Sequence, residues 1–294
     1  MKRLIIGTTI VFGIGLFVFV FPLVSAMSNE RVAAHAVTRF DAAVLKITQD
    51  DKSALREGAD SYNQSLPQNV GIIHEAGFTA SVGTDPVYES LLCLTDDGIM
   101  ATLSIPQIDL ILPIYHYATD DQLEHGVGHI YGTSLPVGGN GTHCVLTGHR
   151  GLPTAELFTR LDELREGSRI YISSLNEILV YDVVNIMVVL PSSVEDMVIS
   201  PDKDLLTLVT CTPYGVNTHR LIVTAERNLS LGGPIEEAKE EEKEAIKPMT
   251  SVVPKKERWR VPVVIILIGG WTWLVIYLRR RQRRQPGKVT EKDS

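Results

Sequence analysis

The chain has 294 residues, of which 44% are hydrophobic, and a formal net charge of −7. This length leaves room for one sizeable packed domain with appendages, and the acidic balance gives no reason to expect a nucleic acid as partner. Three cysteines are too few for a disulfide scaffold, and the odd number leaves at least one thiol free. Cys93 and Cys144 would pair only in an oxidising compartment, and we expect buried packing for both instead.

Two apolar runs, Leu4–Val24 and Val261–Leu278, are long enough to cross a bilayer. Lys2 and Arg3 precede the first run and a cluster of arginines follows the second, so both termini are predicted to be cytoplasmic. A cleaved signal peptide is the alternative for the first run, because small residues end it. The run exceeds the apolar core of about 7–15 residues typical of such peptides, which favours an uncleaved anchor.

Between these runs the pattern changes from helical to β. Apolar residues at helical spacing over Val32–Ile47, and a second stretch at Ser53–Ser65, predict a helical neck. Gly71–Tyr88 is typical of a long loop, and one helix is expected near Thr154–Leu164. The expected strands are Ile99–Ile105, Leu110–Tyr115, His143–Thr147, Arg169–Ile172, Ile178–Leu190, Leu205–Thr210 and Leu221–Ala225. Many short strands with a single helix indicate a mainly β fold, a closed or nearly closed β-barrel with short helices.

Residues Leu205–Ala225 carry the strongest chemical signal. Two apolar runs flank a turn rich in Pro, Gly and Asn, which predicts a strand–turn–strand hairpin. Cys211 ends the first strand and Arg220 begins the second, so the hairpin brings a thiol toward a guanidinium. Cationic neighbours favour the reactive thiolate, and an arginine suits the oxyanion of a tetrahedral intermediate.

His149 follows another predicted strand and is flanked by Gly148 and Arg150-Gly151, a pattern that indicates a bend with an exposed imidazole. Such a ring shuttles protons near neutral pH. His219 is the rival, but strand alternation points it away from the side of Arg220. His143 lies six residues before His149, too far along a strand to serve the same atom.

His125 and His129 have the H-x3-H spacing that binds zinc on a helix. The intervening Gly126 and Gly128 argue against a helix, so we expect no metal, and no cofactor motif appears.

Several segments strongly resemble the sortases, and in detail the class C, pilus-assembling sortases. They are TLVTC at Thr207–Cys211, TPYGVNTHRL at Thr212–Leu221, LTGHRGLP at Leu146–Pro153, GVGHIYGTSLPVGG at Gly126–Gly139 and SIPQIDLILPIYH at Ser104–His116. The resemblance covers about Tyr88–Arg227 and implies a sortase-like closed β-barrel. The double membrane anchor and helical neck also resemble class C.

This resemblance implies a cysteine transpeptidase of Gram-positive bacteria. Cys211 would attack the Thr–Gly bond of an LPxTG-like sorting signal and form a thioacyl enzyme. His149 would protonate the leaving amine, and Arg220 would hold the substrate and stabilise the oxyanion. The acceptor would be a lysine amine of another pilin subunit, so the implied partners are pilin or surface proteins with LPxTG-like signals and the lipid bilayer, with no nucleic acid.

Class C sortases usually carry a lid with an Asp-Pro-aromatic sequence, whose acid contacts the arginine and whose ring covers the cysteine. Here Val87 follows Asp85 and Pro86, and the aromatic comes one place later as Tyr88. The resemblance therefore implies a lid element in which Asp85 pairs with Arg220, with the aromatic displaced by one position.

Together these patterns predict seven segments. They are an N-terminal transmembrane anchor at 1–25, a helical neck at 26–70, a lid-like loop region at 71–98, a catalytic β-barrel at 99–230, a charged linker at 231–258, a C-terminal transmembrane helix at 259–279 and a basic cytoplasmic tail at 280–294. The charged stretch Glu236–Lys247 within the linker is expected to be a solvated helix or a flexible tether.

Three alternatives stay open at this stage. A housekeeping sortase would anchor surface proteins to peptidoglycan, with a cross-bridge amine as acceptor. A plain thiol protease is weaker, because the caspase-type signature is absent and the papain order of Cys before His is reversed. A non-enzymatic two-span surface scaffold would use the same Cys, His and Arg only structurally.

Overall fold

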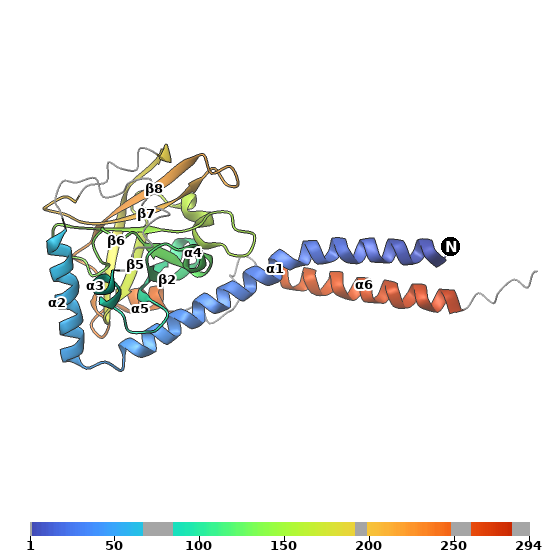
Figure 1. Cartoon of the computed structure of the whole chain (residues 1–294), viewed down its shortest axis with the longest axis horizontal. Helices are drawn as coiled ribbons and strands as arrows, with labels where there is room; N and C mark the ends of the chain where they lie inside the picture. The colour runs from blue at the N-terminus through green and yellow to red at the C-terminus, as the bar shows by residue number, and fades with distance from the viewer. Residues whose placement is uncertain (1, 67–84, 192–198, 248–259, 284–294) are drawn as a thin grey trace, which may run out of the picture. The chain divides into compact units, whose positions relative to one another are not determined.

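The computed structural model describes residues 2–66, 85–191, 199–247 and 260–283 (Figure 1). The chain forms two compact units, one of residues 26–252 and one in which residues 1–25 associate with residues 253–294. The helix α1 (Lys2–Val44) contributes to both units, and α6 (Arg260–Arg283) belongs to the second.

A closed β-barrel forms the centre of the larger unit. Its strands are β1 (Ile99–Ile105), β2 (Leu110–His116), β3 (Val127–His129), β4 (Thr142–Thr147), β5 (Arg169–Ser174), β6 (Glu177–Val189), β7 (Asp204–Thr212) and β8 (His219–Arg227). They are ordered β5-β1-β2-β3-β4-β7-β8-β6, and a β5–β6 pairing closes the ring. The β2–β3 and β4–β7 pairs are parallel and the others antiparallel, while the short β9 (Gly233–Pro234) adds to β6. The mainly β, closed barrel expected from the sequence is confirmed.

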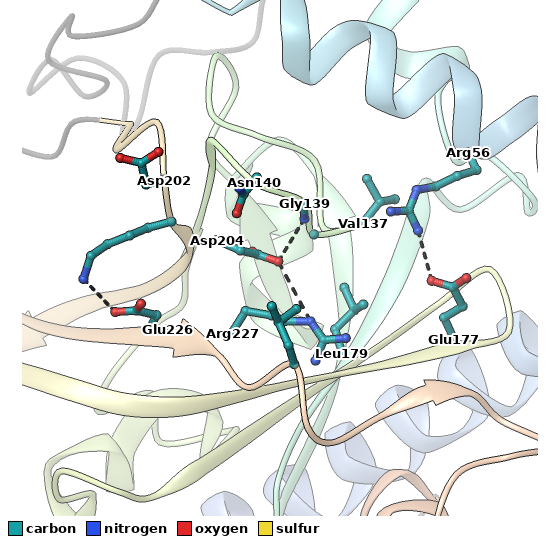
Figure 2. A pocket seen from close by; sticks show the side chains of 13 residues that line it. Arg56, Val137, Gly139, Asn140, Glu177, Leu179, Asp202, Asp204, Glu226 and Arg227 are labelled. Atoms are coloured by element: carbon teal, nitrogen blue, oxygen red, sulfur yellow. Dashed lines mark hydrogen bonds and ion pairs between the residues drawn. The ribbon is translucent and has the colours of Figure 1, made fainter.

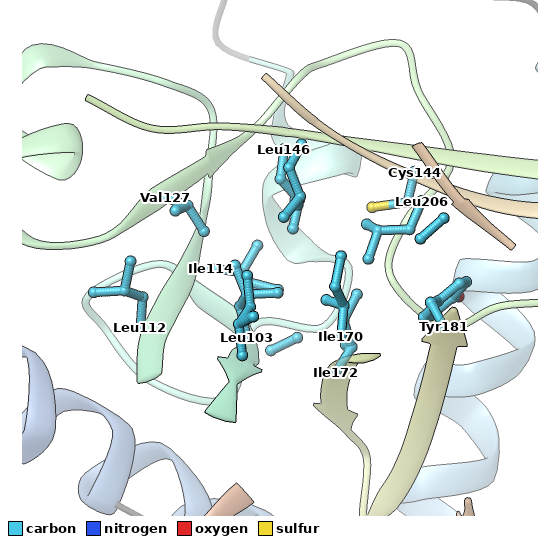
Figure 3. Close-up of a cluster of buried hydrophobic side chains, with 14 of the residues drawn as sticks. Leu103, Leu112, Ile114, Val127, Cys144, Leu146, Ile170, Ile172, Tyr181 and Leu206 are labelled. Atoms are coloured by element: carbon cyan, nitrogen blue, oxygen red, sulfur yellow. The ribbon is translucent and has the colours of Figure 1, made fainter. Parts of the chain in front are cut away.

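The barrel interior is filled by alternate side chains of its strands. Leu103, Ile114, Leu146, Ile172 and Leu206 are all fully buried and lie together inside the barrel (Figure 3). The intervening residues of β4, β7 and β8 point to the opposite side, as strand alternation requires. There Val145, Val209 and Ile222 join Ile130, which follows β3, in a second apolar group, the outer-face cluster.

Short helices pack around the barrel. They are α2 (Gln49–Ser65), α3 (Pro86–Ser90), η2 (Pro106–Ile108), α4 (Asp120–His125), η3 (Leu157–Glu163) and α5 (Glu240–Ile246). The start of α2 is fixed by a capping box in which Thr48 and Asp51 satisfy each other's backbone N–H groups. Near its end the buried Asn63 accepts a 2.7 Å hydrogen bond from the backbone of Leu135, which ties α2 to the barrel.

The structure corrects several expected boundaries. The helix expected at Thr154–Leu164 is the shorter 3₁₀ helix η3, and the strands β3 and β9 were not predicted. Residues 86–90 of the expected loop form α3, because the Asp85 carboxylate accepts from the backbone of Val87 and Tyr88 and so caps the helix. The preceding residues 67–84 lie outside the described part of the chain.

The helix expected within the charged stretch is present as α5, but it is docked on the barrel through one face. Ala238 and Ala245 are buried against Tyr171 and Val180 of the barrel, and the Ser104 hydroxyl donates to the carbonyl of Ala245. The charged residues around these two alanines concealed a small apolar face.

In the smaller unit, α1 is the one described helix that is long and apolar enough to cross a membrane. This agrees with the predicted N-terminal anchor, although the anchor and the first neck helix form one continuous helix. The apolar stretch of α6, Ile265–Tyr277, is shorter than the about 20 residues that a span requires, so the second span is not supported.

All three cysteines are free. Cys144 is buried as expected, but Cys93 is exposed, so its predicted buried packing is wrong.

Candidate active site

Cys211 and Arg220 are directly opposite each other on the antiparallel strands β7 and β8. Opposite residues of such a pair have Cβ atoms about 4.5–5.5 Å apart and point to the same face. The hairpin predicted from the sequence therefore brings the thiol and the guanidinium together, and both residues are half-buried.

His149 follows β4, which runs parallel to β7 with Thr147 opposite Val209. Two residues further along each strand, the same register brings His149 beside Cys211. The register continues past the strand end, because the Gly148 N–H donates to the Val209 carbonyl at 3.2 Å and the Thr210 hydroxyl donates to the Gly148 carbonyl at 2.7 Å.

Two of the side chains share one face of the sheet. Cys211 and Arg220 each lie two residues from the member of the outer-face cluster on their own strand, and alternate strand residues point the same way. The thiol and the guanidinium thus lie on the outer face of the barrel, at the end of β7 and the start of β8, and the backbone of His149 lies beside them, two residues past the end of β4. The outer-face cluster forms an apolar floor beside them.

Arg220 has hydrogen bonds only to neutral acceptors. Its Nη1 donates to the carbonyls of Asn217 at 3.3 Å and His219 at 3.2 Å. Over the described ranges it forms no ion pair with a carboxylate, so its positive charge is available to an anion.

The backbone around His149 is held from the side of η3. Its carbonyl accepts from the Phe158 N–H at 3.1 Å. A side chain at Gly148 would lie 2.8 Å from the Phe158 ring, so only glycine lets the strand end approach the fully buried Phe158 this closely. The bend expected from the glycines is thus a tightly packed one.

The residues expected in a lid lie in a different arrangement. Asp85 accepts from the Tyr131 hydroxyl at 2.7 Å, and this hydrogen bond lowers the pKa of the Asp85 carboxyl. Tyr88 is fully buried, with its hydroxyl 2.7 Å from Nδ1 of His129. Asp85 therefore pairs with Tyr131 and not with Arg220, while Pro86 begins α3 and Tyr88 fills an aromatic cluster at the barrel.

Three other histidines have local partners. His143 contacts the Thr207 hydroxyl at 2.8 Å, and His219 contacts that of Thr218 at 2.9 Å. His129 is enclosed by Tyr88 and the Ser134 carbonyl, and burial lowers its pKa to about 4. Within the described residues no group of three His, Cys, Asp or Glu side chains is arranged to hold a metal ion.

A separate cavity of about 270 Å³ lies at the other end of β7 and β8 (Figure 2). Asp204 begins β7, about 23 Å from Cys211 at the usual rise per residue. Its buried carboxylate accepts from Gly139 N at 2.9 Å and from the Tyr181 hydroxyl at 3.0 Å, and lies 3.9 Å from Arg227. The burial raises the pKa of Asp204.

Four further charged residues of this cavity form two ion pairs. Arg56 contacts Glu177 at 3.0 Å, and Lys203 contacts Glu226 at 2.7 Å. The first contact joins α2 to β6, and the second joins the start of β7 to β8. Together they give the cavity a structural role in closing this end of the barrel.

The contact between Arg150 and Thr212 was missed by the sequence analysis. The Arg150 guanidinium donates to the Thr212 hydroxyl at 2.8 Å, between the residues that follow His149 and Cys211. The adjacency of each residue to a candidate group was visible in the sequence, but their contact depends on the β4–β7 register.

Comparisons with known proteins identify relatives of the chain. A family model described as the sortase domain matches residues 103–228. Sortase A of Streptococcus agalactiae is 28% identical over 149 residues, which are 50% of this chain and 60% of that protein. The chain thus spans about three fifths of the length of this curated relative.

Solved structures match over nearly their whole length. Sortase C-1 of Actinomyces oris is 44% identical with a TM-score of 0.56, and the match covers 61% of this chain and 98% of that one. The Pilus Island 1 sortase C2 of Group B Streptococcus is 39% identical with a TM-score of 0.56, covering 62% of this chain and 99% of that one.

Proposed function

Because the chain belongs to the sortase family, we propose that it is a membrane-anchored cysteine transpeptidase with Cys211 as nucleophile. His149 carries the proton and Arg220 holds the developing anion. The observation that supports this most strongly is the placement of the three residues: Cys211 lies opposite Arg220, and the β4–β7 register brings the backbone of His149 beside Cys211.

In the first half-reaction the substrate is a protein with an LPxTG-like sorting signal. The Cys211 thiolate attacks the carbonyl carbon of the threonine, and the oxygen of the tetrahedral intermediate takes the negative charge. Arg220 donates hydrogen bonds to this oxyanion. As the C–N bond breaks, His149 protonates the leaving glycine amine, and a thioester on Cys211 remains.

In the second half-reaction a lysine amine of a pilin subunit attacks the thioester carbonyl. His149 accepts a proton from the incoming amine, the C–S bond breaks, and the thiolate leaves. One amide bond has been exchanged for another, so the reaction needs no cofactor and no redox partner.

Similarity to sortase C structures, one of which is named for a pilus island, supports a pilin as acceptor. The curated Sortase A relative favours the second candidate, attachment of surface proteins to a peptidoglycan cross-bridge amine. The two functions share the first half-reaction and differ in the amine that completes the second.

The proposal is tested with the full chain in detergent, an LPxTG-type peptide, and a lysine-bearing pilin peptide as acceptor. Joined product is expected from the unchanged chain and none from Cys211→Ala or His149→Ala. Arg220→Ala is expected to lower kcat about 100- to 1000-fold, the usual effect of losing an oxyanion donor.

His219→Ala is the matched control, since this histidine is adjacent to Arg220 but points to the other face, and we expect its activity to stay within about threefold. Product from Cys211→Ala would contradict the proposal. No product from the unchanged chain would favour the scaffold, and product only with a cross-bridge peptide would assign the chain to wall anchoring.

We also propose that both termini are cytoplasmic and that α6 crosses the membrane as a second span. Lys2 and Arg3 before α1, and the arginines at the end of α6, support this topology. In protoplasts treated with a protease from outside, a C-terminal epitope tag is expected to survive while the barrel is accessible. Loss of the tag before lysis would contradict the second span.

A further inference from the structure

Arg150 forms a polar bridge beside the candidate active site. Its Nη1 donates to the Thr212 hydroxyl at 2.8 Å, and its Nη2 donates to the Asp162 carboxylate of η3 at 2.6 Å. Arg150 directly follows His149, and Thr212 directly follows Cys211. The guanidinium therefore joins the two backbone segments that carry the imidazole and the thiol.

A second contact between these segments lies next to the bridge. Gly151 has a φ of +84°, and a side chain built on it would lie 3.2–3.5 Å from the ring of Tyr214. Tyr214 belongs to the turn between β7 and β8. The loop after His149 thus packs against the turn after Cys211 through one polar and one aromatic contact.

The environment of Arg150 is costly for a residue with only a packing role. Its side chain is 7% exposed, whereas its ionic partner Asp162 is 52% exposed. Its Nε is buried and has no hydrogen-bond partner among the described residues. An apolar side chain of similar size commonly replaces such a buried charge without loss of stability, so its presence here points to a function.

We propose that Arg150 is a positioning residue that sets the distance between His149 and Cys211 by bridging Thr212 to Asp162. The planar fork of the guanidinium reaches two acceptors at a fixed spacing, which a lysine amine cannot reproduce. The inference rests on the proposed transpeptidase function. It extends that function by assigning the geometry of the proton transfer to three residues outside the reacting groups: Arg150, Asp162 and Thr212.

Displacing a reacting group by about 1 Å can reduce a rate about 100-fold without weakening substrate binding. In the full chain in detergent, Arg150→Met and Thr212→Val are therefore expected to lower kcat for peptide cleavage 10- to 100-fold, with KM within about twofold. Arg150→Lys restores one of the two bonds and is expected to be intermediate. The double variant Arg150→Met/Thr212→Val is expected to be no slower than the slower single variant, because both remove the same bridge.

Arg160→Met is the matched control. Arg160 belongs to η3, as Asp162 does. Its side chain is 17% exposed and pairs with Glu163, but the structure gives it no contact with residues 149–151 or 211–214. Its variant is expected to keep kcat within about twofold. A drop in kcat equal to that of Arg150→Met, or unchanged kcat in both Arg150→Met and Thr212→Val, would overturn the inference.

A readout without sorting peptide separates this inference from the proposed function. In a Cys93→Ala background, iodoacetamide reports the reactivity of Cys211, since Cys144 is buried. At pH 7 the alkylation rate is expected to fall at least threefold in Arg150→Met and in Thr212→Val but not in Arg160→Met. If the alkylation rates show this pattern but the unchanged chain does not turn over peptide, the transpeptidase function is refuted and the bridge is not. If the chain turns over peptide but the alkylation rates are equal, the bridge is refuted and the transpeptidase function is not.

Discussion

At the scale of single residues, the buried pair of His129 and Tyr88 explains why Tyr88 lies against the barrel. The Tyr88 ring contacts His116, Tyr117 and Tyr131 edge-on and is fully buried. A fully buried ring hydrogen-bonded to a fully buried imidazole holds α3 against the barrel.

His129 makes the fold sensitive to acid. Burial lowers its pKa from 6.5 to about 4, so the folded state binds the proton more weakly than the unfolded chain does. The stabilisation is complete above pH 6.5 and is lost as the pH falls toward 4. Between pH 7 and pH 4.5 we expect the free energy of unfolding to fall by about 2–3 kcal/mol from this residue.

Urea unfolding of the full chain at several pH values measures this loss. His129→Gln keeps a hydrogen-bonding side chain that does not titrate, so its stability is expected to fall less steeply over the same interval. Parallel slopes for the two proteins would show that His129 is not responsible.

The residues proposed to react could be selected from the sequence because each stands at a recognisable strand end. Cys211 and Arg220 flank a turn of Pro, Gly and Asn, and His149 stands between glycines. Arg150 and Thr212 were not predictable, since they are separated by 62 positions and meet only through the parallel β4–β7 register.

At the scale of elements, α5 shows how a charged segment docks on a barrel. Ala238 and Ala245 are the small buried residues of this segment, and the Ser104 hydroxyl reaches the carbonyl of Ala245. Small side chains allow the backbone to approach β1 closely, so a large residue at either position would not fit.

Ala245→Arg tests this docking. Overpacking at a buried position is expected to lower the free energy of unfolding by about 1–3 kcal/mol. Glu237→Arg, at an exposed position of the same segment, is expected to change it by less than about 0.5 kcal/mol. Equal urea midpoints for Ala245→Arg and the unchanged chain would indicate that α5 does not contribute to stability.

The elements that were predicted are those with a strong periodic pattern, such as β1 and the β7–β8 hairpin. The strands β3 and β9 span only Val127–His129 and Gly233–Pro234, too short to show alternation. Their pairing depends on neighbouring strands that already exist, and the docking of α5 likewise depends on a surface that the sequence does not display.

At the scale of the whole molecule, the two ends of the β7–β8 hairpin differ. One end carries two of the proposed catalytic residues, and the other helps to close the barrel. At one end Cys211 lies opposite Arg220. Among the described residues, the guanidinium of Arg220 donates hydrogen bonds only to backbone carbonyls. The other end carries the buried Asp204 network that joins the 137–142 loop to the barrel. The half-buried thiol of Cys211 thus lies at one end of a hairpin whose other end is anchored by this network.

The closed barrel was predictable from its many short strands separated by turns, and the N-terminal anchor from its long apolar run. The length of the apolar stretch of α6 was not predictable in the same way. This stretch, Ile265–Tyr277, is short, and the remaining turns of the helix are basic or polar. The placement of the site on the outer face required the register of three strands.

The most direct test of the central claim is the covalent state of Cys211 after the full chain meets an LPxTG-type peptide without an acceptor amine. Peptide mapping by mass spectrometry is expected to find the donor peptide, truncated after its threonine, as a thioester on Cys211, with Cys93 and Cys144 unmodified. An intact donor peptide with all three thiols free, or an acyl group on another residue, would contradict the account.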